Sequence, residues 1–152
     1  MADIAQRLEE LGITLPPVFP PAGSYIGASK IGNVLFVSGH GPSLGDGKFI
    51  RGKVGHDLTV DEGREAARVT ALSILATMDD AVGLDHVRRI VKVLGMVNTA
   101  PGFNNTPAVI DGASDLFIQV FGEDGRAARS AVGLAELPFD IAVEIELVAE
   151  ID

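Results

Sequence analysis

A long helical pattern, held between an N-terminal cap and a C-terminal glycine, constrains this chain more than any other sequence feature. The segment Thr59–Glu62 forms a capping box, in which Thr59 caps the Glu62 amide and the Glu62 side chain reaches back. Apolar residues then recur at helical spacing to about Val82, and Gly83 provides the stop. This pattern predicts one long amphipathic helix with an apolar stripe to bury.

A second helix and six strand patterns surround the first helix. Thr106 and Pro107 place a cap and a proline at the start of a helix that runs to Phe121, with Gly122 after it. Strand patterns cover residues 25–29, 34–38, 48–54, 87–97, 127–135 and 139–150, and Gly32-Asn33 suits a tight hairpin between the first two. The order β-β-β-α-β-α-β-β predicts a two-layer α+β fold, with a mixed sheet and both helices on one face.

The first 22 residues predict an arm that precedes the domain. A short helix is expected over residues 3–11, and the pairs Pro16-Pro17 and Pro20-Pro21 then force an extended connector. The remaining length is that of a single domain. We therefore expect a helix and proline-rich arm over residues 1–22 and one domain over residues 23–152.

The composition argues against several classes of protein. The chain has no cysteine, which excludes disulfides, thiolate nucleophiles and cysteine-based zinc sites. A formal charge of −9, from 21 acidic and 12 basic residues, makes nucleic acid an unfavourable partner. The N-terminus lacks the apolar core of a signal peptide, and no run approaches the ~18 apolar residues that span a bilayer. We expect a cytoplasmic protein that does not engage membranes.

The last two predicted strands carry a charged pair. Alternation along residues 139–150 places Glu144 and Glu146 on the face opposite the apolar side chains. If the two strands form a hairpin centred on residues 136–137, Arg129 lies directly across from Glu144, with Cβ atoms about 4.5–5.5 Å apart. This register is an assumption that a single bulge would break.

Two interpretations of this pair are open. An arginine fork binds a carboxylate ligand through two parallel bonds, and the small neighbours Ala131 and Gly133 leave room for one beside Arg129. The simpler interpretation is a cross-strand salt bridge between Arg129 and Glu144, which contributes about 1 kcal/mol or less when exposed. The strand pattern alone favours the salt bridge.

Four ordered segments resemble the signature segments of a known family, the reactive-intermediate deaminases (Rid/YjgF, formerly endoribonuclease L-PSP). They are residues Gly23–Tyr25, Asn33–Pro42, Ala128–Gly133 and Val143–Glu146. Their spacing also fits, with 13 residues from Tyr25 to Ser38 and 15 from Arg129 to Glu144. The resemblance covers about residues 23–149.

The resemblance implies a fold, an assembly and an activity. The expected fold is chorismate-mutase-like, of the bacillus chorismate mutase type, in a homotrimer whose sheets form an inner barrel. Three clefts between adjacent subunits would hydrolyse 2-iminopropanoate and 2-iminobutanoate to 2-keto acids and ammonia. The resemblance implies no metal and no organic cofactor.

Site roles carry over by position from the same resemblance. Arg129 would clamp the substrate carboxylate, and Glu144 would orient or activate the attacking water. The remaining expected substrate-binding residues are Tyr25, Ser38, Gly39, His40 and Ser114. His40 also fits two other interpretations, a general base or simply a histidine in a turn at the end of a strand.

The cleft segments depart from the common family pattern at several places. Ser114 stands where the second helix usually has an asparagine, and His40 stands where glutamine is common. Ile26-Gly27 replaces the usual polar residues, and the segment before the second helix, residues 98–105, is longer than usual. These differences indicate a subgroup with a different preferred substrate.

Two functions of other classes are also compatible with the sequence. A non-catalytic trimeric binding module for small carboxylates such as 2-keto acids would keep Arg129 but would not need Glu144. An endoribonuclease, the activity in the former family name, is disfavoured by the acidic balance.

Overall fold

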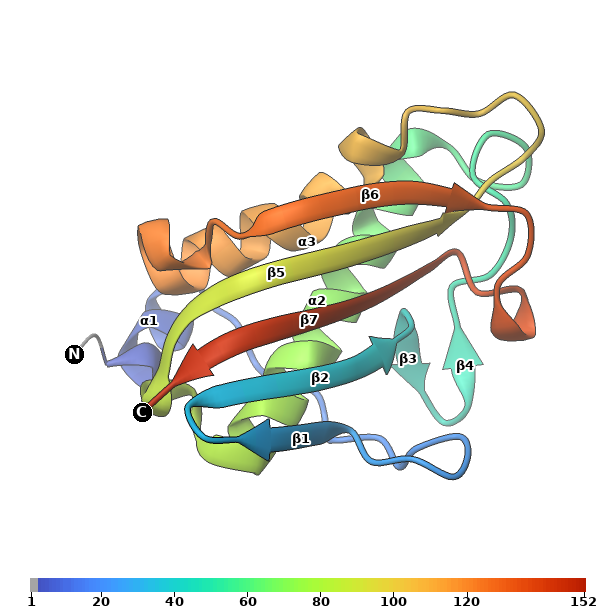
Figure 1. Cartoon of the computed structure of the whole chain (residues 1–152). Coiled ribbons are helices and arrows are strands. Elements are labelled where there is room, and N and C mark those ends of the chain that lie inside the picture. The colour runs from blue at the N-terminus through green and yellow to red at the C-terminus, as the bar shows by residue number, and fades with distance from the viewer. Residues whose placement is uncertain (1–2) are drawn as a thin grey trace.

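The computed structural model describes residues 3–152 and shows a five-stranded mixed sheet with helices on one face (Figure 1). The helices are α1 (Ile4–Glu10), α2 (Val60–Val82) and α3 (Thr106–Phe121), with short 3-10 helices η1 (Leu84–His86), η2 (Gly122–Gly125) and η3 (Pro138–Asp140). The strands are β1 (Ala28–Ile31), β2 (Val34–His40), β3 (Ser43–Gly45), β4 (Lys48–Phe49), β5 (Val87–Asn98), β6 (Ala128–Leu134) and β7 (Val143–Ile151). None of these helices, within residues 3–152, is long and apolar enough to cross a membrane.

The sheet has the strand order β1-β2-β7-β5-β6. Neighbouring strands are antiparallel except for β5 and β6, which are parallel. The long helices α2 and α3 lie behind the sheet in Figure 1 and leave the front uncovered. The predicted α+β class, with a mixed sheet and both long helices on one face, is confirmed.

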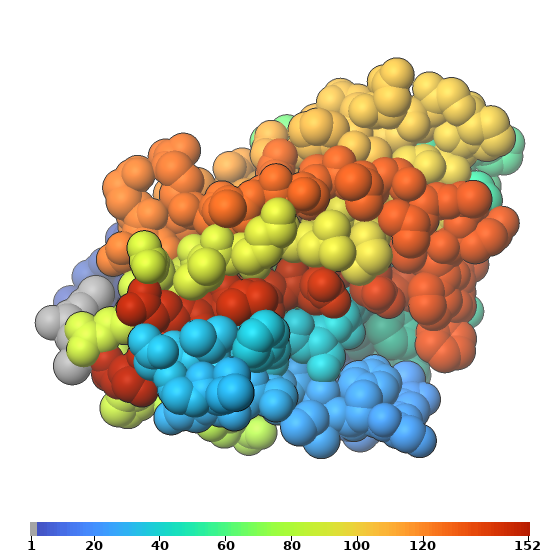
Figure 2. Space-filling model, in the orientation of Figure 1, coloured from blue at the N-terminus to red at the C-terminus, as the bar shows by residue number. Residues whose placement is uncertain are grey.

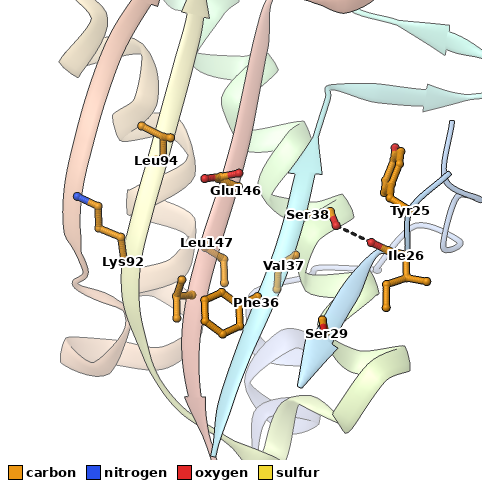
Figure 3. Close-up of a pocket in the computed structure, with 11 residues that line it drawn as sticks. Tyr25, Ile26, Ser29, Phe36, Val37, Ser38, Lys92, Leu94, Glu146 and Leu147 are labelled. Carbon is orange, nitrogen blue, oxygen red and sulfur yellow. Dashed lines mark hydrogen bonds between the residues drawn. The ribbon is translucent and has the colours of Figure 1, made fainter. Parts of the chain in front are cut away.

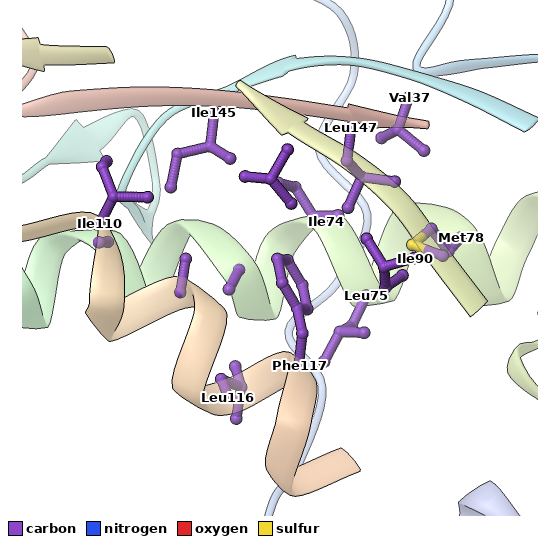
Figure 4. Packing of buried hydrophobic residues seen from close by; sticks show 14 of the residues in the cluster. Val37, Ile74, Leu75, Met78, Ile90, Ile110, Leu116, Phe117, Ile145 and Leu147 are labelled. Atoms are coloured by element: carbon purple, nitrogen blue, oxygen red, sulfur yellow. The ribbon is translucent and has the colours of Figure 1, made fainter. Parts of the chain in front are cut away.

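The core lies between the sheet and the two long helices (Figure 4). Ile74 of α2, Ile110 and Phe117 of α3, and Ile145 of β7 are all fully buried. Burial of each such side chain contributes about 1.5–3 kcal/mol. Helix α3 lies so close to β5 that a Cβ on Gly95 would come within 2.6 Å of Ile110. The glycine therefore sets how tightly α3 packs on the sheet.

Local sequence signals correctly predict two features, the first hairpin and the capping box of α2. The hairpin across Gly32-Asn33 is confirmed, since Ile31 pairs with Val34. The Thr59 hydroxyl accepts from the Glu62 amide at 3.1 Å, as the capping box predicts. The Glu62 carboxylate, however, accepts from that same hydroxyl rather than from the Thr59 amide.

Thr106 does not cap α3, contrary to the sequence expectation. Asn105 occupies the cap position without a side-chain hydrogen bond, and Thr106 is the first helical residue. The Thr106 hydroxyl instead donates to the Ala131 carbonyl at 2.9 Å and so ties the start of α3 to β6.

The predicted strand over residues 48–54 is largely wrong. Only Lys48–Phe49 forms a strand there, in a separate two-stranded sheet with β3. Gly52 and Gly55 adopt positive φ angles of 115° and 96°, which interrupt an extended ladder. The first strand was predicted over residues 25–29, whereas β1 begins at Ala28 and ends at Ile31.

The predicted hairpin between the last two strands is wrong as well. Strand β5 lies between β6 and β7, so β6 pairs with β5 in parallel while β7 pairs with both β5 and β2. The connection through η3 carries the chain across the end of β5. Every second side chain of β7 is buried, from Val143 to Ile151. A strand at the centre of the sheet pairs along both of its edges, and β7 takes this position. Strand β6, with more exposed residues, takes the outer position.

The N-terminal arm packs onto the domain. Asp3 caps α1 by accepting from the Gln6 amide at 2.9 Å, and Ile4 joins the main hydrophobic core. The Ile4 amide donates to the carboxylate of Asp85 in η1, at 2.8 Å. The division of the chain at residue 22 stays a prediction.

The uncovered face of the sheet, which Figure 2 shows in space-filling form, carries apolar side chains. Phe36 of β2 and Val132 of β6 are 49% and 41% exposed. Exposed apolar side chains on an open sheet face often mark a site of contact with another protein chain.

Candidate functional site

The seven predicted site residues fall into two separate groups. Five of them, Tyr25, Ser38, Gly39, His40 and Glu144, line one cavity of about 580 Å³. The other two, Arg129 and Ser114, lie together on β6 and α3, and neither lines this cavity. The structure thus places the expected carboxylate clamp apart from the expected water-activating glutamate.

Arg129 and Glu144 lie on opposite faces of the sheet. Arg129 pairs in register with Val93, whose side chain is buried in the core on the helix side. Glu144 pairs with Met96, which lies three residues after Val93 along β5 and therefore points to the opposite face. Glu144 thus projects from the uncovered face. The predicted contact between Arg129 and Glu144 is wrong for a single subunit, because it depended on the β6–β7 hairpin.

A β-bulge in β2 shapes the cavity wall beside Glu144. The register shifts between Val37, which pairs with Leu147, and His40, which pairs with Ile145. This bulge presents Gly39 to the Glu144 side chain. A Cβ on Gly39 would lie 2.9 Å from Glu144 Oε2, so the carboxylate lies directly against the glycine backbone.

Hydrogen bonds fasten the bulge to the segment before β1. The Ser38 hydroxyl donates to the Ile26 carbonyl at 2.5 Å, the bond that Figure 3 shows, and the Ser38 amide donates to the Gly27 carbonyl at 2.9 Å. Tyr25 is 49% exposed, and its hydroxyl accepts from the Ala22 amide at 3.1 Å. The arm and the bulge are therefore joined around the cavity.

His40 uses both ring nitrogens within the protein. Nδ1 lies 2.5 Å from the Ser38 carbonyl, and Nε2 lies 2.8 Å from the Thr77 hydroxyl of α2. A carbonyl only accepts, so Nδ1 carries the proton and Nε2 of the neutral ring accepts from Thr77. Burial lowers the pKa of His40, although the hydrogen bond to Ser38 opposes this shift. The arrangement favours the structural interpretation of His40 over a general base.

Glu144 has the electrostatics of a proton acceptor. Burial raises its pKa above the ordinary value for glutamate, and the neighbouring Glu146 carboxylate raises it further. A raised pKa makes the ionised carboxylate a stronger base. No basic side chain of the same subunit pairs with Glu144 within residues 3–152 under the usual 4.0 Å limit for an ion pair.

Polar side chains of α3 hold the side chain of Arg129, which comes from β6. Its Nη1 donates to Asp111 Oδ1 at 2.7 Å and to the Ser114 hydroxyl at 3.2 Å. The Arg129 side chain is 22% exposed, so part of the guanidinium still faces solvent. Sequence reasoning missed Asp111, although it lies three residues before Ser114 and therefore on the same face of the helix.

A second cavity, of about 440 Å³, lies on the uncovered face of the sheet (Figure 3). Phe36, Leu94, Lys92 and Glu146 line it, from β2, β5 and β7. Tyr25 and Ser38 line both cavities, so the two hollows share one wall.

Comparisons with known proteins place the chain in a family. A family model described as "YjgF/chorismate mutase-like, putative endoribonuclease" matches residues 5–151. The chain belongs to the Rid/YjgF family. It is 44% identical over 151 residues to Protein TCP17 of Trypanosoma cruzi, covering 98% of this chain and 94% of that one.

A further relative and a solved structure extend the comparison. The chain is 30% identical over 141 residues to a 2-iminobutanoate/2-iminopropanoate deaminase of Dermatophagoides farinae, covering 92% of this chain and 95% of that one. A crystal structure of an Agrobacterium tumefaciens protein of unknown function superposes with a TM-score of 0.89 at 43% identity, covering 98% and 92% of the two chains. The chorismate-mutase-like fold expected from the resemblance is thereby supported over nearly the whole chain.

The environment of His40 generates a prediction about stability and pH. The unfolded chain has a histidine pKa near 6.5, whereas burial lowers the folded value, so the unfolded chain takes up the proton first as the pH falls. The His40 contribution is therefore complete above about pH 6.5 and is lost as the pH falls below it. Replacing His40 by glutamine should cost about 1–2 kcal/mol at pH 8, through the lost hydrogen bonds, and should flatten the stability profile below pH 6.5.

Urea unfolding at pH values from 5 to 8 measures both effects. His56 and His86 have 80% and 63% exposed side chains and remain in both proteins, so they cancel in the difference. Equal pH slopes for the wild type and His40→Gln would contradict this account of His40.

Proposed function

We propose that this protein hydrolyses reactive 2-imino acids to 2-keto acids and ammonia, in clefts between the subunits of a homotrimer. The observation that carries the proposal is the division of the site. The Glu144 cavity and the Arg129 cluster each hold half of the needed groups, and they lie on opposite faces of one sheet. Only a second copy of the chain can bring an Arg129 to a Glu144.

The uncovered sheet face supports the assembly. Phe36, Leu94 and Val132 lie on this face with part of their surface open. Three copies that turn these faces toward a common axis would cover them, and a cyclic arrangement is the usual closed solution for such a surface. The outer strand β6 of one copy would then lie against the cavity of the next.

Each group has a defined role in the proposed reaction. Arg129 of the partner subunit binds the substrate carboxylate through the exposed part of its guanidinium, while Asp111 and Ser114 fix its orientation. Ser38 and the Gly39 backbone line the cavity beside Glu144. The Glu144 carboxylate accepts a proton from a water as the water oxygen attacks the imine carbon.

The chemistry needs few other groups. A protonated imine is already an electrophile, so water addition gives a tetrahedral carbinolamine with both nitrogen and oxygen on the former imine carbon. Glu144 then returns its proton to the nitrogen, and its carboxylate takes up the hydroxyl proton as the carbon–nitrogen bond breaks. Ammonia leaves and the carbonyl forms. Positioning of substrate and water supplies much of the rate. The deaminase named among the relatives supports this choice of reaction.

Substitution of the two charged residues tests the proposal. With freshly generated 2-iminopropanoate and 2-iminobutanoate and a semicarbazide trap, Arg129→Ala should lower kcat/KM by about 100-fold, mainly through substrate binding. Replacing Glu144 by glutamine should lower kcat by about 100-fold or more, because the proton acceptor is lost. Arg126→Ala is the matched control, since Arg126 has a 64% exposed side chain and pairs only with Glu123 among residues 3–152.

Three results would count against this proposal. A wild type that does not accelerate hydrolysis would favour the alternative function, a non-catalytic binding module for small carboxylates. Full activity of Glu144→Gln would remove the proposed proton acceptor. Hydrolysis of RNA that survives moderate salt would instead favour the endoribonuclease in the family description.

The contact between Gly39 and Glu144 gives a second prediction. A methyl group on Gly39 would lie 2.9 Å from Glu144 Oε2, so Gly39→Ala should displace the carboxylate. A displacement of about 1 Å in a catalytic group costs on the order of 100-fold in rate. Stability should change by less than about 1 kcal/mol, because the far end of a glutamate side chain moves easily. Turnover assays with thermal melts check both, and unchanged turnover would contradict the contact.

A further inference from the structure

The aromatic residues of this chain are concentrated at the Glu144 cavity. The sequence has only seven phenylalanines and one tyrosine. Four of these eight, Phe19, Tyr25, Phe49 and Phe139, line the cavity. Within residues 3–152, Phe117 alone among the aromatic residues is fully buried in the core. The packing of the domain depends on aliphatic side chains, so it does not account for this aromatic wall.

Phe139 holds an unfavourable backbone conformation at the rim of the cavity. Its φ and ψ are 58° and 19°, in the left-handed region, and Asp140 follows with a φ of 56°. Residues other than glycine, asparagine and aspartate rarely adopt this region. The Phe139 side chain gains little burial in return, because the residue is 66% exposed.

A polar network enforces this turn. Asn98, which is fully buried, donates to Asp140 Oδ1 at 2.9 Å and accepts from Lys53 Nζ at 2.8 Å. The Gly52 amide donates to the Asp140 carbonyl at 2.9 Å, and Lys53 also donates to the Ala135 carbonyl. Backbone strain that the surroundings fix in this way is found preferentially at ligand-binding and active sites.

The arm places a second aromatic ring on the cavity. Phe19 and the proline pair that follows it line the cavity together with Phe139. The Ala22 amide donates to the Tyr25 hydroxyl, which anchors the end of the arm at the cavity wall. The four rings therefore come from the arm, from the segment before β1, from β4 and from the η3 turn.

We propose that this aromatic wall selects 2-imino acids with an aromatic or large branched apolar side chain; this specificity rests on the proposed function. A cavity of about 580 Å³ is in the size range of pockets that enclose drug-sized ligands, and a methyl or ethyl side chain would leave most of it to water. Glu144 and the Gly39 backbone occupy the polar part of the same cavity, so the reacting carbon can lie there while the side chain reaches Phe139. Phe139 is the specificity-determining residue, with Phe19 beside it.

Competition between imines of different size tests the proposal. An L-amino-acid oxidase generates the imines of phenylalanine, leucine and alanine in situ, and a semicarbazide trap reports their lifetimes. The wild type should prefer the phenylalanine-derived imine over the alanine-derived one by about tenfold or more in kcat/KM. The variant Phe139→Asn keeps a residue that tolerates the left-handed backbone and removes the ring. It should lower that preference by about tenfold.

A matched pair of variants separates the effect of the Phe19 ring from that of the arm that carries it. Phe19→Ala should also lower the preference, whereas Val18→Ala, at a neighbouring 44% exposed residue that does not line the cavity, should not. A wild type that prefers the alanine-derived imine, or a Phe139→Asn variant with unchanged preference, overturns the proposal.

Binding of stable 2-keto acids keeps the specificity testable if no imine is hydrolysed. Calorimetry with phenylpyruvate and pyruvate measures the same cavity without catalysis. Tighter binding of phenylpyruvate that Phe139→Asn abolishes would support the aromatic wall even though the deaminase had failed. Equal binding of the two acids would overturn the wall independently of the reaction.

Discussion

The central position of β7 is the constraint on which the rest of the structure depends. Its alternate residues Val143, Ile145 and Leu147 are buried against the helices, while its edges pair with β2 and β5. The same alternation sends Glu144 to the uncovered face. Because β5 must lie on one side of β7, β6 is forced to the outer edge and takes Arg129 with it. The divided site follows directly from the sheet order.

The second determinant of the site is the bulge in β2. It lets Gly39 meet the Glu144 carboxylate at close range, and it turns His40 toward Thr77 of α2. Any residue other than glycine at this position would place its Cβ about 2.9 Å from Glu144 Oε2. The bulge therefore links the packing of α2 on the sheet to the position of the carboxylate.

The sequence predicted local structure well where a signal is local. The cap at Thr59, the stop at Gly83 and the Gly32-Asn33 hairpin all depend on neighbouring residues, and all are confirmed. Alternation also placed Glu144 correctly on the face away from the core. These signals survive because each one is set by a few successive backbone conformations.

The sequence did not reveal which strands lie next to each other in the sheet. Strand alternation specifies which face a side chain takes, but the same pattern fits a hairpin and a crossover, so the pairing of Arg129 with Glu144 was wrong. The partner of Arg129, Asp111, depends on α3 lying over β6, which no local pattern reveals. Similarly, the aromatic wall joins Phe19 to Phe139 only after the chain has folded.

Subunit complementation tests the central claim, that one catalytic site needs two copies of the chain. Arg129→Ala and Glu144→Gln variants are each expected to be about 100-fold less active than the wild type. Tagged forms can be co-expressed, and the mixed trimers confirmed by native mass spectrometry. Equal mixing should restore about a quarter of the sites, because a site works when its Arg129 and its Glu144 both come from intact donors. Recovered imine hydrolysis near that level would support a site between subunits. Verified mixed trimers without activity would contradict it.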